Sequence, residues 1–238
     1  MVFGKFLHHR PLKTTEPSRR AMVRSLHTLL SLLVLISTPA FAVAPTVRTP
    51  NSGIARLQAF QANVRSMEAR FRQQVMAANR KVLEDTSGSV VMQRPGRFRW
   101  NYQAPFERVI VADGEKVWLY EADLDQVTIR RLSAGIGATP AALLTGKETV
   151  LKHFNIEKSW VEDGLAFVRL VPKSADAEFA GVTLGFKGPE LRRLLLDDRL
   201  GQQTRIDLSE LRINRRLPPE LFRFKAPPGA DVIDDSEL

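Results

Sequence analysis

The feature that most limits the possible folds is a long succession of short segments with a period of two residues, separated by turn signals. The clearest segment runs from Arg97 to Tyr102, where aromatic and polar side chains alternate. This alternation predicts a half-buried strand with one apolar face and one polar face. Asp113-Gly114, Asp163-Gly164 and residues 198–201 predict hairpin turns between such strands.

About ten strands with few helices describe a single antiparallel sheet, and a sheet with so many strands tends to curl. A curled sheet that closes incompletely leaves a cavity able to hold one ligand. We therefore predict an α+β fold, a curled and incompletely closed antiparallel β-barrel with helices on its concave side. The predicted strands are residues 69–75, 90–92, 97–102, 108–112, 117–120, 127–129, 159–161, 166–171, 182–186, 193–196 and 204–208.

Two helices and one brief turn interrupt this series. A helix is predicted from Ser52, because apolar residues then recur every three to four positions. Those residues are Ile54, Leu57, Phe60, Val64 and Met67. A short helix is predicted at Pro140–Thr145, since Thr139 supplies an N-cap and Pro140 suits the first helical position. Pro218 to Leu221 is predicted to form a brief turn.

The N-terminal region reads as a secretory signal peptide. Three arginines, the last of them Arg24, precede an apolar run from Leu26 to Ile36, and residues 38–42 provide a small-residue cleavage site. The apolar run is shorter than the roughly 20 residues that span a bilayer. We predict export with cleavage after Ala42, with Met1 or Met22 as the start, and a single mature domain over residues 43–238.

Removal of residues 1–42 changes the charge argument. The full chain holds 35 Lys and Arg against 26 Asp and Glu, and six of the basic residues and one acidic residue lie in that segment. The remainder therefore has 29 basic and 25 acidic residues. A nucleic-acid-binding surface needs a clustered basic face, so no nucleic-acid partner is predicted.

Missing residue types argue against several kinds of catalytic or metal site. The chain has no cysteine, so it can form neither a disulfide nor the lipid-anchored cysteine of a lipoprotein. His153 is the single histidine after residue 42, which leaves no histidine cluster for a metal. A Ser-His-Asp triad would depend on this one residue, and no G-x-S-x-G motif is present. We therefore predict no catalytic residues, no metal and no cofactor.

Two stretches of the chain resemble the outer-membrane lipoprotein carrier family, LolA. They are Gln93–Tyr102, which reads QRPGRFRWNY, and Ile110–Tyr120, which reads IVADGEKVWLY. The resemblance continues, in the same order and spacing, through Gln126–Thr128, Thr139-Pro140, Asp198–Thr204, Leu221–Phe224 and Pro228–Val232.

This resemblance implies an unclosed barrel with short helices as a lid over a hydrophobic cavity. It further implies that Arg94 is a latch that bonds to backbone carbonyls of the lid, with Pro140–Thr145 as the lid helix. Taken together with the strand pattern, it implies lipid binding by Phe71, Phe98, Trp100, Ile110, Trp118, Leu143 and Leu144. Without the resemblance, Arg94 reads as a solvated arginine at a turn, and Phe98 and Trp100 read as ordinary core residues.

The function that the resemblance implies is that of a monomeric periplasmic carrier for the acyl chains of lipoproteins. It would load from an ABC-type, ATP-driven transporter of the inner membrane and unload to an outer-membrane receptor. Two alternatives stay open: a similar carrier for another lipid or acyl product, and a lipid hydrolase.

Overall fold

The computed structural model describes residues 52–132, 144–145, 150–175, 177 and 179–237. The chain separates into two compact units, Met1–Pro45 and Thr46–Leu238, and the description concerns the second. The predicted signal peptide lies outside the described residues. None of the helices in the described part of the chain is long and apolar enough to cross a bilayer.

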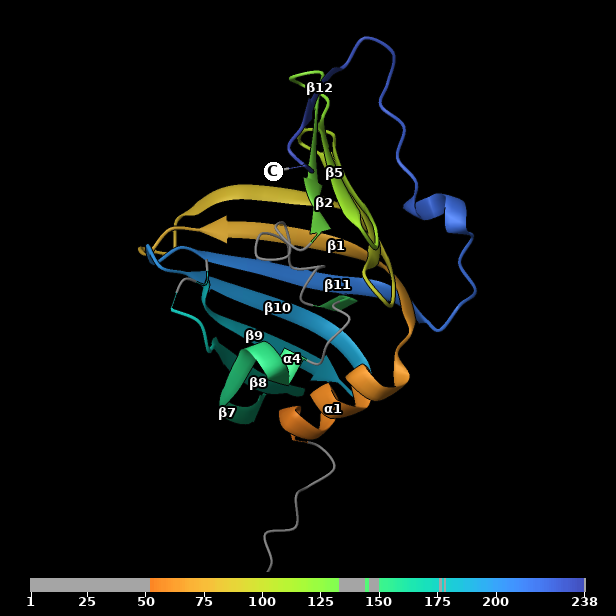
Figure 1. Ribbon diagram of the computed structural model, residues 1–238. Coiled ribbons are helices and arrows are strands. Elements are labelled where there is room, and N and C mark those ends of the chain that lie inside the picture. Colours follow the sequence, from red (N-terminus) through yellow and green to blue (C-terminus); the bar gives the residue numbers. More distant parts are fainter. Residues whose placement is uncertain (1–51, 133–143, 146–149, 176, 178, 238) are drawn as a thin grey trace, which may run out of the picture. The chain divides into compact units, whose positions relative to one another are not determined.

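Twelve strands form one curled sheet in the order β12-β6-β5-β4-β3-β2-β1-β11-β10-β9-β8-β7 (Figure 1). The two end strands, β12 and β7, do not pair with each other, so the sheet is not closed into a barrel. The strands are β1 Ser66–Met76, β2 Val82–Gln93, β3 Arg97–Ala104, β4 Arg108–Asp113, β5 Lys116–Glu121, β6 Gln126–Arg131, β7 Phe154–Glu162, β8 Leu165–Pro172, β9 Phe179–Lys187, β10 Glu190–Asp198, β11 Gln203–Ile213 and β12 Asp231–Asp234.

The predicted curled and unclosed sheet is confirmed, but the sheet is mixed rather than antiparallel. Consecutive strands pair as antiparallel neighbours within β1–β6 and within β7–β11, and β11 joins β1. The exception is β12, which the sequence did not predict and which pairs with β6 in parallel. All four β12 residues are exposed, so this strand carries no two-faced pattern.

The predicted helix at Ser52 is confirmed as α1, Gly53–Asn63. The Ser52 hydroxyl accepts a hydrogen bond from the Ala55 amide at 3.2 Å and caps the helix. Gly53 lets the helix approach β8, since a Cβ at that position would lie 2.0 Å from the Phe167 carbonyl oxygen. The apolar spacing does not mark the end of the helix, because Val64 already has an extended backbone and Met67 belongs to β1.

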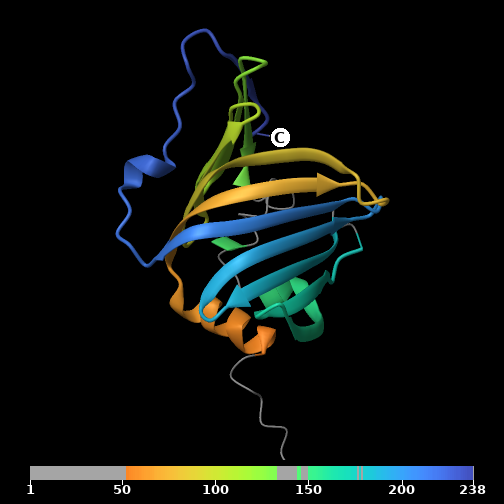
Figure 2. The ribbon, with the colours of Figure 1, turned by 180° about the vertical axis from the view of Figure 1, so that it is seen from behind.

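Two further short helices accompany the sheet, α4 (Val150–His153) and the 3-10 helix η2 (Pro219–Phe222). Leu57 and Phe60 of α1 are buried in the main core, with the Phe60 and Phe186 ring centres 5.8 Å apart. We call the sheet face that α1 covers the inner face and its opposite the outer face. Figure 2 shows the sheet from behind.

The strand registers assign side chains to these faces. On the inner face the buried cluster extends across β1–β3 and β8–β11 and reaches Leu144. Its largest fully buried members are Phe98, Phe186, Leu57, Met67, Met92, Leu170, Leu191, Leu194, Ile206 and Val90.

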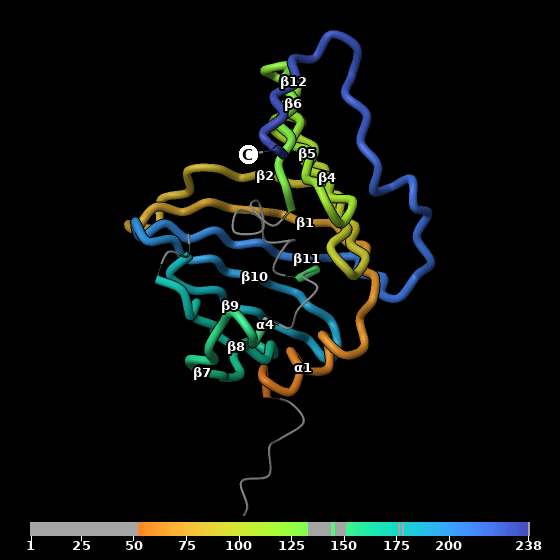
Figure 3. The backbone as a smooth tube through the Cα atoms, viewed as in Figure 1, coloured from red at the N-terminus to blue at the C-terminus, as the bar shows by residue number. Residues whose placement is uncertain are grey.

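A second apolar layer lies on the outer face of β3–β6. After β11 the chain makes a long excursion through η2 and returns to the sheet at β12 (Figure 3). In that excursion η2 packs against β3 and β4, and the Phe224 ring centre lies 6.0 Å from that of Tyr120. Val111, Val127 and Phe222 are at most 2% exposed yet lie outside the main core cluster. We call this the outer layer.

Candidate functional site

Four of the predicted site residues share the inner face of neighbouring strands. Trp100 on β3 pairs directly with Ile110 on β4, and the ring centres of Phe71 and Trp100 are 4.8 Å apart. Phe71, Phe98 and Trp100 are at most 3% exposed, and Ile110 is half-buried. The alternation read from the sequence therefore placed these side chains on one face correctly.

Leu144 joins the same cluster from outside the sheet. It is 4% exposed, packs in the inner-face core, and is helical together with Thr145. These two residues are the described part of the predicted helix Pro140–Thr145. Leu143 lies outside the described residues.

Trp118 does not belong to this group, which corrects its assignment to the lipid-binding surface. It pairs with Val111, whereas its neighbour Leu119 pairs with Ile110. Since directly paired residues share a face, Trp118 lies on the outer face and Leu119 lies on the inner face. The physical reason is that β5 is apolar on both faces, because the outer layer covers the side that solvent would otherwise occupy.

Arg94 contacts α1 rather than standing free at its turn. Its Nη1 donates to the Gln61 carbonyl oxygen at 2.8 Å, and its guanidinium lies 5.4 Å from the centre of the Phe60 ring. The Arg94 amide also donates to the Arg65 carbonyl oxygen at 2.8 Å. The Arg94 Nε atom is buried without a hydrogen-bond partner among the described residues. Burial lowers the pKa of this guanidinium.

The link between this turn and the predicted lid helix is made by the main chain. The Gly96 amide donates to the Thr145 carbonyl oxygen at 2.8 Å, and Thr145 is 1% exposed. Gly96 has φ +70°, and a Cβ there would lie 3.1 Å from a Leu132 methyl group. In the described residues, then, the Arg94 side chain is bonded to α1, and its turn holds the 144–145 segment.

A polar group of inner-face residues was not predicted from the sequence. Gln73, Thr86 and Tyr102 are 6–8% exposed, and the Tyr102 hydroxyl donates to the Gln73 side-chain oxygen at 3.2 Å. Burial raises the pKa of Tyr102 to about 12. The sequence does contain a sign of this polar group, because the alternation of β1 places Gln73 on the same face as Phe71 and Val75.

Two further features of the described residues concern metal ligands and a surface hollow. The described part of the chain contains no group of three or more His, Cys, Asp or Glu able to hold a metal ion. A hollow of about 350 Å³ lies at the β8–β9 connection, and none of the predicted site residues lines it. Its lining residues are Val171, Pro172, Lys173, Ser174, Ala175, Phe179, Ala180 and Arg199.

Comparisons with known proteins match most of the chain. The family model for the outer membrane lipoprotein carrier protein LolA matches residues 62–225. A relative from Nitrosospira multiformis, named outer-membrane lipoprotein carrier protein, is 41% identical over 191 residues, covering 80% of this chain and 92% of the relative. A relative of the same name from Methylobacillus flagellatus is 41% identical over 204 residues, covering 86% of this chain and 98% of the relative.

Two solved structures are similar to this chain at low sequence identity. A LolA superfamily protein from Nitrosomonas europaea has a TM-score of 0.45 and 11% identity, with 73% of this chain and 98% of that chain covered. An uncharacterized conserved protein from Thermus thermophilus has a TM-score of 0.47 and 15% identity, with 76% and 96% covered. Because the family model spans most of the described domain and its named relatives align over nearly their whole length, the chain belongs to the LolA outer-membrane lipoprotein carrier family.

Proposed function

We propose that this protein is a periplasmic carrier that holds the acyl chains of lipoproteins against its inner face. Residues 1–42 would direct export, and the remaining chain would act as a monomer. It would receive its cargo from an ABC-type transporter of the inner membrane and deliver it to an outer-membrane receptor. The observation that carries the proposal is the apolar inner face around Phe71, Phe98, Trp100 and Ile110, which shares one core cluster with α1 and with Leu144.

Acyl-chain energetics explain why such a surface needs a cover. Each CH₂ group removed from water contributes about 0.8 kcal/mol, so long chains would bind almost irreversibly to a rigid open pocket. A closed empty state opposes loading and lowers the apparent affinity for cargo. A carrier that must pass its cargo on therefore benefits from a cover that is held closed only modestly.

The contacts of Arg94 would hold such a cover closed only weakly. One guanidinium nitrogen bonds to the Gln61 carbonyl of α1, while the buried Nε has no partner in the described residues. The charged hydrogen bond favours the closed arrangement, and the unmet donor opposes it. We infer that Arg94 acts as a latch between the β2–β3 turn and α1. A solvated turn arginine would lack both its contact with Phe60 and its burial.

The most direct test places a charge on the apolar surface. In the wild type, a fluorescent hydrophobic probe should bind without unfolding the protein, and purified lipoprotein should displace it. Phe98→Glu should weaken binding of both at least tenfold, because a carboxylate replaces apolar surface where the acyl chains would lie. Asn101→Glu, on the same strand but on the outer face, should bind both normally.

Circular dichroism must first show that both variants are folded. Normal binding by a folded Phe98→Glu protein would remove Phe98 from the site, and failure of the wild type to bind the probe would overturn the carrier proposal. Depletion of this protein in its host distinguishes between the possible cargoes. Accumulation of lipoproteins at the inner membrane would support a lipoprotein carrier. Normal lipoprotein sorting would favour a carrier of another lipid or acyl product. Release of fatty acid from acyl esters would favour a hydrolase.

A further inference from the structure

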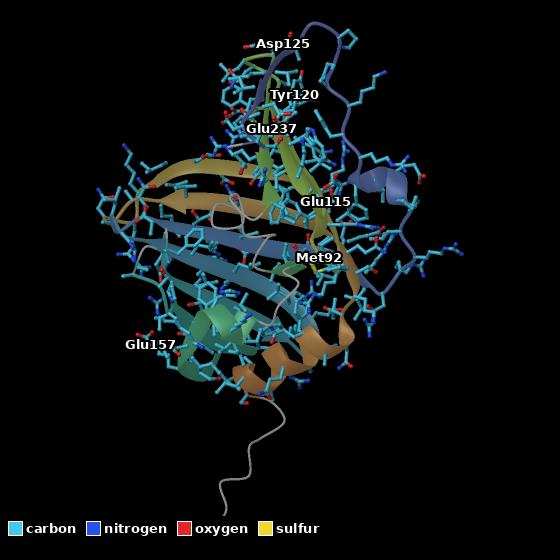
Figure 4. The ribbon with its side chains drawn as sticks, viewed as in Figure 1. Met92, Glu115, Tyr120, Asp125, Glu157 and Glu237 are labelled. Atoms are coloured by element: carbon cyan, nitrogen blue, oxygen red, sulfur yellow. The ribbon has the colours of Figure 1, made fainter. Side chains whose placement is uncertain are left out.

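The inner face of β1–β4 changes from apolar to polar along the strands. At the end next to α1, Met92, Phe98 and Ala112 lie in one row across β2, β3 and β4, and each is at most 1% exposed (Figure 4 labels Met92). The next inner-face position on β3 is Trp100, which contacts Phe71 of β1. Apart from the indole N–H of Trp100, these residues provide an apolar surface.

The surface becomes polar over the next two positions: Phe71, Gly88 and Tyr102 pair across β1–β3, and Gln73 and Thr86 follow one inner-face position further. Gln73 on β1 pairs directly with Thr86 on β2, and the Tyr102 hydroxyl of β3 donates to Gln73. The Tyr102 ring lies 5.0 Å from Phe71 and 6.3 Å from Trp100 between ring centres, so this polar band adjoins the aromatic row.

Two donors in this region have no acceptor. The Thr86 hydroxyl and the Trp100 Nε1–H are fully buried and lack a hydrogen-bond partner among the described residues. Both side chains are more than nine-tenths buried, at 6% and 2% exposure. Buried polar groups in folded proteins are almost always paired, so two unmet donors beside one apolar surface require an explanation.

Charged residues border the band, on the neighbouring strand β4 and further along β2. Arg108 of β4 pairs with Tyr102, and its guanidinium lies 5.7 Å from the centre of the Tyr102 ring and 3.6 Å from a Glu121 carboxylate oxygen. Glu84, the next inner-face residue of β2 after Thr86, is exposed. From Phe98 toward Tyr102 and Thr86 the inner face therefore changes from apolar to neutral polar, and charged residues border the polar part.

We propose that the polar band binds the ester carbonyl oxygens of the acylated glycerol and so sets the direction in which the lipid lies. Thr86 and Trp100 donate to these carbonyls, the acyl chains extend toward Met92 and Phe98, and the head of the cargo lies toward Arg108. An ester carbonyl can only accept hydrogen bonds, which matches two donors without acceptors. This inference rests on the proposed function and adds the part of the lipid that is recognised.

A matched pair of lipids tests it: 1-palmitoylglycerol, which is an ester, and 1-O-hexadecylglycerol, an ether of the same chain length without the carbonyl. Each is titrated against the protein by displacement of the fluorescent hydrophobic probe. The wild type should bind the ester about fivefold to tenfold more tightly, the factor that about one neutral hydrogen bond supplies.

Thr86→Val removes the hydroxyl at nearly constant shape and should reduce this preference to about twofold or less, with ether affinity unchanged. Thr86→Ser keeps the donor and should retain the preference. Thr183→Val is the matched control: Thr183 is also buried, at 3% exposure, but its pairing with Leu195 and Arg169 places it on the outer face.

Equal affinity of the folded wild type for ester and ether would overturn the inference, as would an undiminished preference in folded Thr86→Val. If Thr86→Val does not fold, Trp100→Phe provides the second test, with the same expected loss of preference. If the wild type binds neither lipid, the proposed carrier function itself fails, which is a different result from binding both equally.

Discussion

On the inner face, the core aromatic side chains lie beneath α1 and Leu144, whereas on the outer face a long C-terminal segment covers β3–β6. The inner face contains polar groups whose hydrogen bonds are incomplete, namely Thr86, Trp100 and Arg94. The outer layer is closed by Phe222 and by the pairing of β12 with β6. Beside the outer layer, the buried Ser236 hydroxyl also lacks a hydrogen-bond partner among the described residues. We propose that the inner face opens for cargo and that the outer layer stays closed.

Ionic and hydrogen-bond contacts at the edge of the sheet support this distinction. The Arg131 guanidinium donates to the Ser236 carbonyl oxygen at 2.5 Å, and Lys116 and Arg130 lie 3.8 Å from carboxylates of Asp234 and Asp235. These ion pairs are largely exposed, so each contributes little to stability by itself. Together they fix the position of residues 234–236 relative to β5 and β6.

The largest expected effect is a loss of stability when a buried ring is removed from the outer layer. Phe222→Ala should lower the free energy of unfolding by about 3–5 kcal/mol, because it leaves a cavity where a fully buried ring had packed. Urea denaturation measures this loss. In the fraction that remains folded, hydrophobic-probe affinity should be unchanged; a parallel loss of probe affinity would show that the two layers are not separate.

The two tyrosines of the chain lie on opposite faces and report on each layer by their ionisation. Burial raises the pKa of Tyr102 from 10.0 to about 12, because the ionised form loses its hydration. Partial burial and then Asp125 also raise the pKa of Tyr120, whose side chain lies near the tip of the β5–β6 hairpin (Figure 4). Tyr102 should therefore remain neutral at a pH where an unfolded chain would ionise it.

The sign of the stability effect follows. A phenol whose folded pKa is raised stabilises the protein fully below pH 10, and this contribution is lost as the pH rises from about 10 to 12. The loss should amount to roughly 2–3 kcal/mol. Tyr102→Phe should remove most of the loss and leave only the contribution of Tyr120, whereas Tyr120→Phe should keep most of it. Tyrosinate absorbance checks the assignment, and a Tyr102 that titrates near 10 in the folded protein would contradict its burial.

The sequence predicts the face on which a strand residue lies only where solvent reaches the other face of that strand. Phe98 and Trp100 were placed correctly, because polar neighbours alternate with them along β3. Trp118 was misplaced, because Val117–Tyr120 is apolar at every position and the period of two then disappears. The cover that causes this, the segment through Phe222, comes from a distant part of the chain.

The same reasoning explains the other differences. Strand β12 could not be predicted, since its exposed residues Asp231–Asp234 gain their order from pairing with β6. The family resemblance predicts a latch role for Arg94, but its Gln61 partner depends on how α1 meets the sheet. Gln73 was visible at an inner-face position of β1, and its meaning required the pairing with Thr86 and the contact with Tyr102.

The smallest expected effect concerns the cover of the inner face. Arg94→Leu removes the charged hydrogen bond to the Gln61 carbonyl and, with it, much of the preference for the closed empty state. The variant should still fold and load lipoprotein, but transfer to the outer-membrane receptor should slow about tenfold, the equivalent of about 1.4 kcal/mol. The reason is that closure no longer opposes retention of the cargo.

Transfer is measured with purified loaded carrier and receptor, and Arg97→Leu is the matched control, since Arg97 is an exposed arginine on the outer face of β3. The control should transfer at the wild-type rate. If Arg94→Leu did so too, its contact with α1 would be only structural, and closure would have to depend on other contacts. The Gly96–Thr145 bond would then be the next candidate, because it holds the 144–145 segment to the same turn without any side chain.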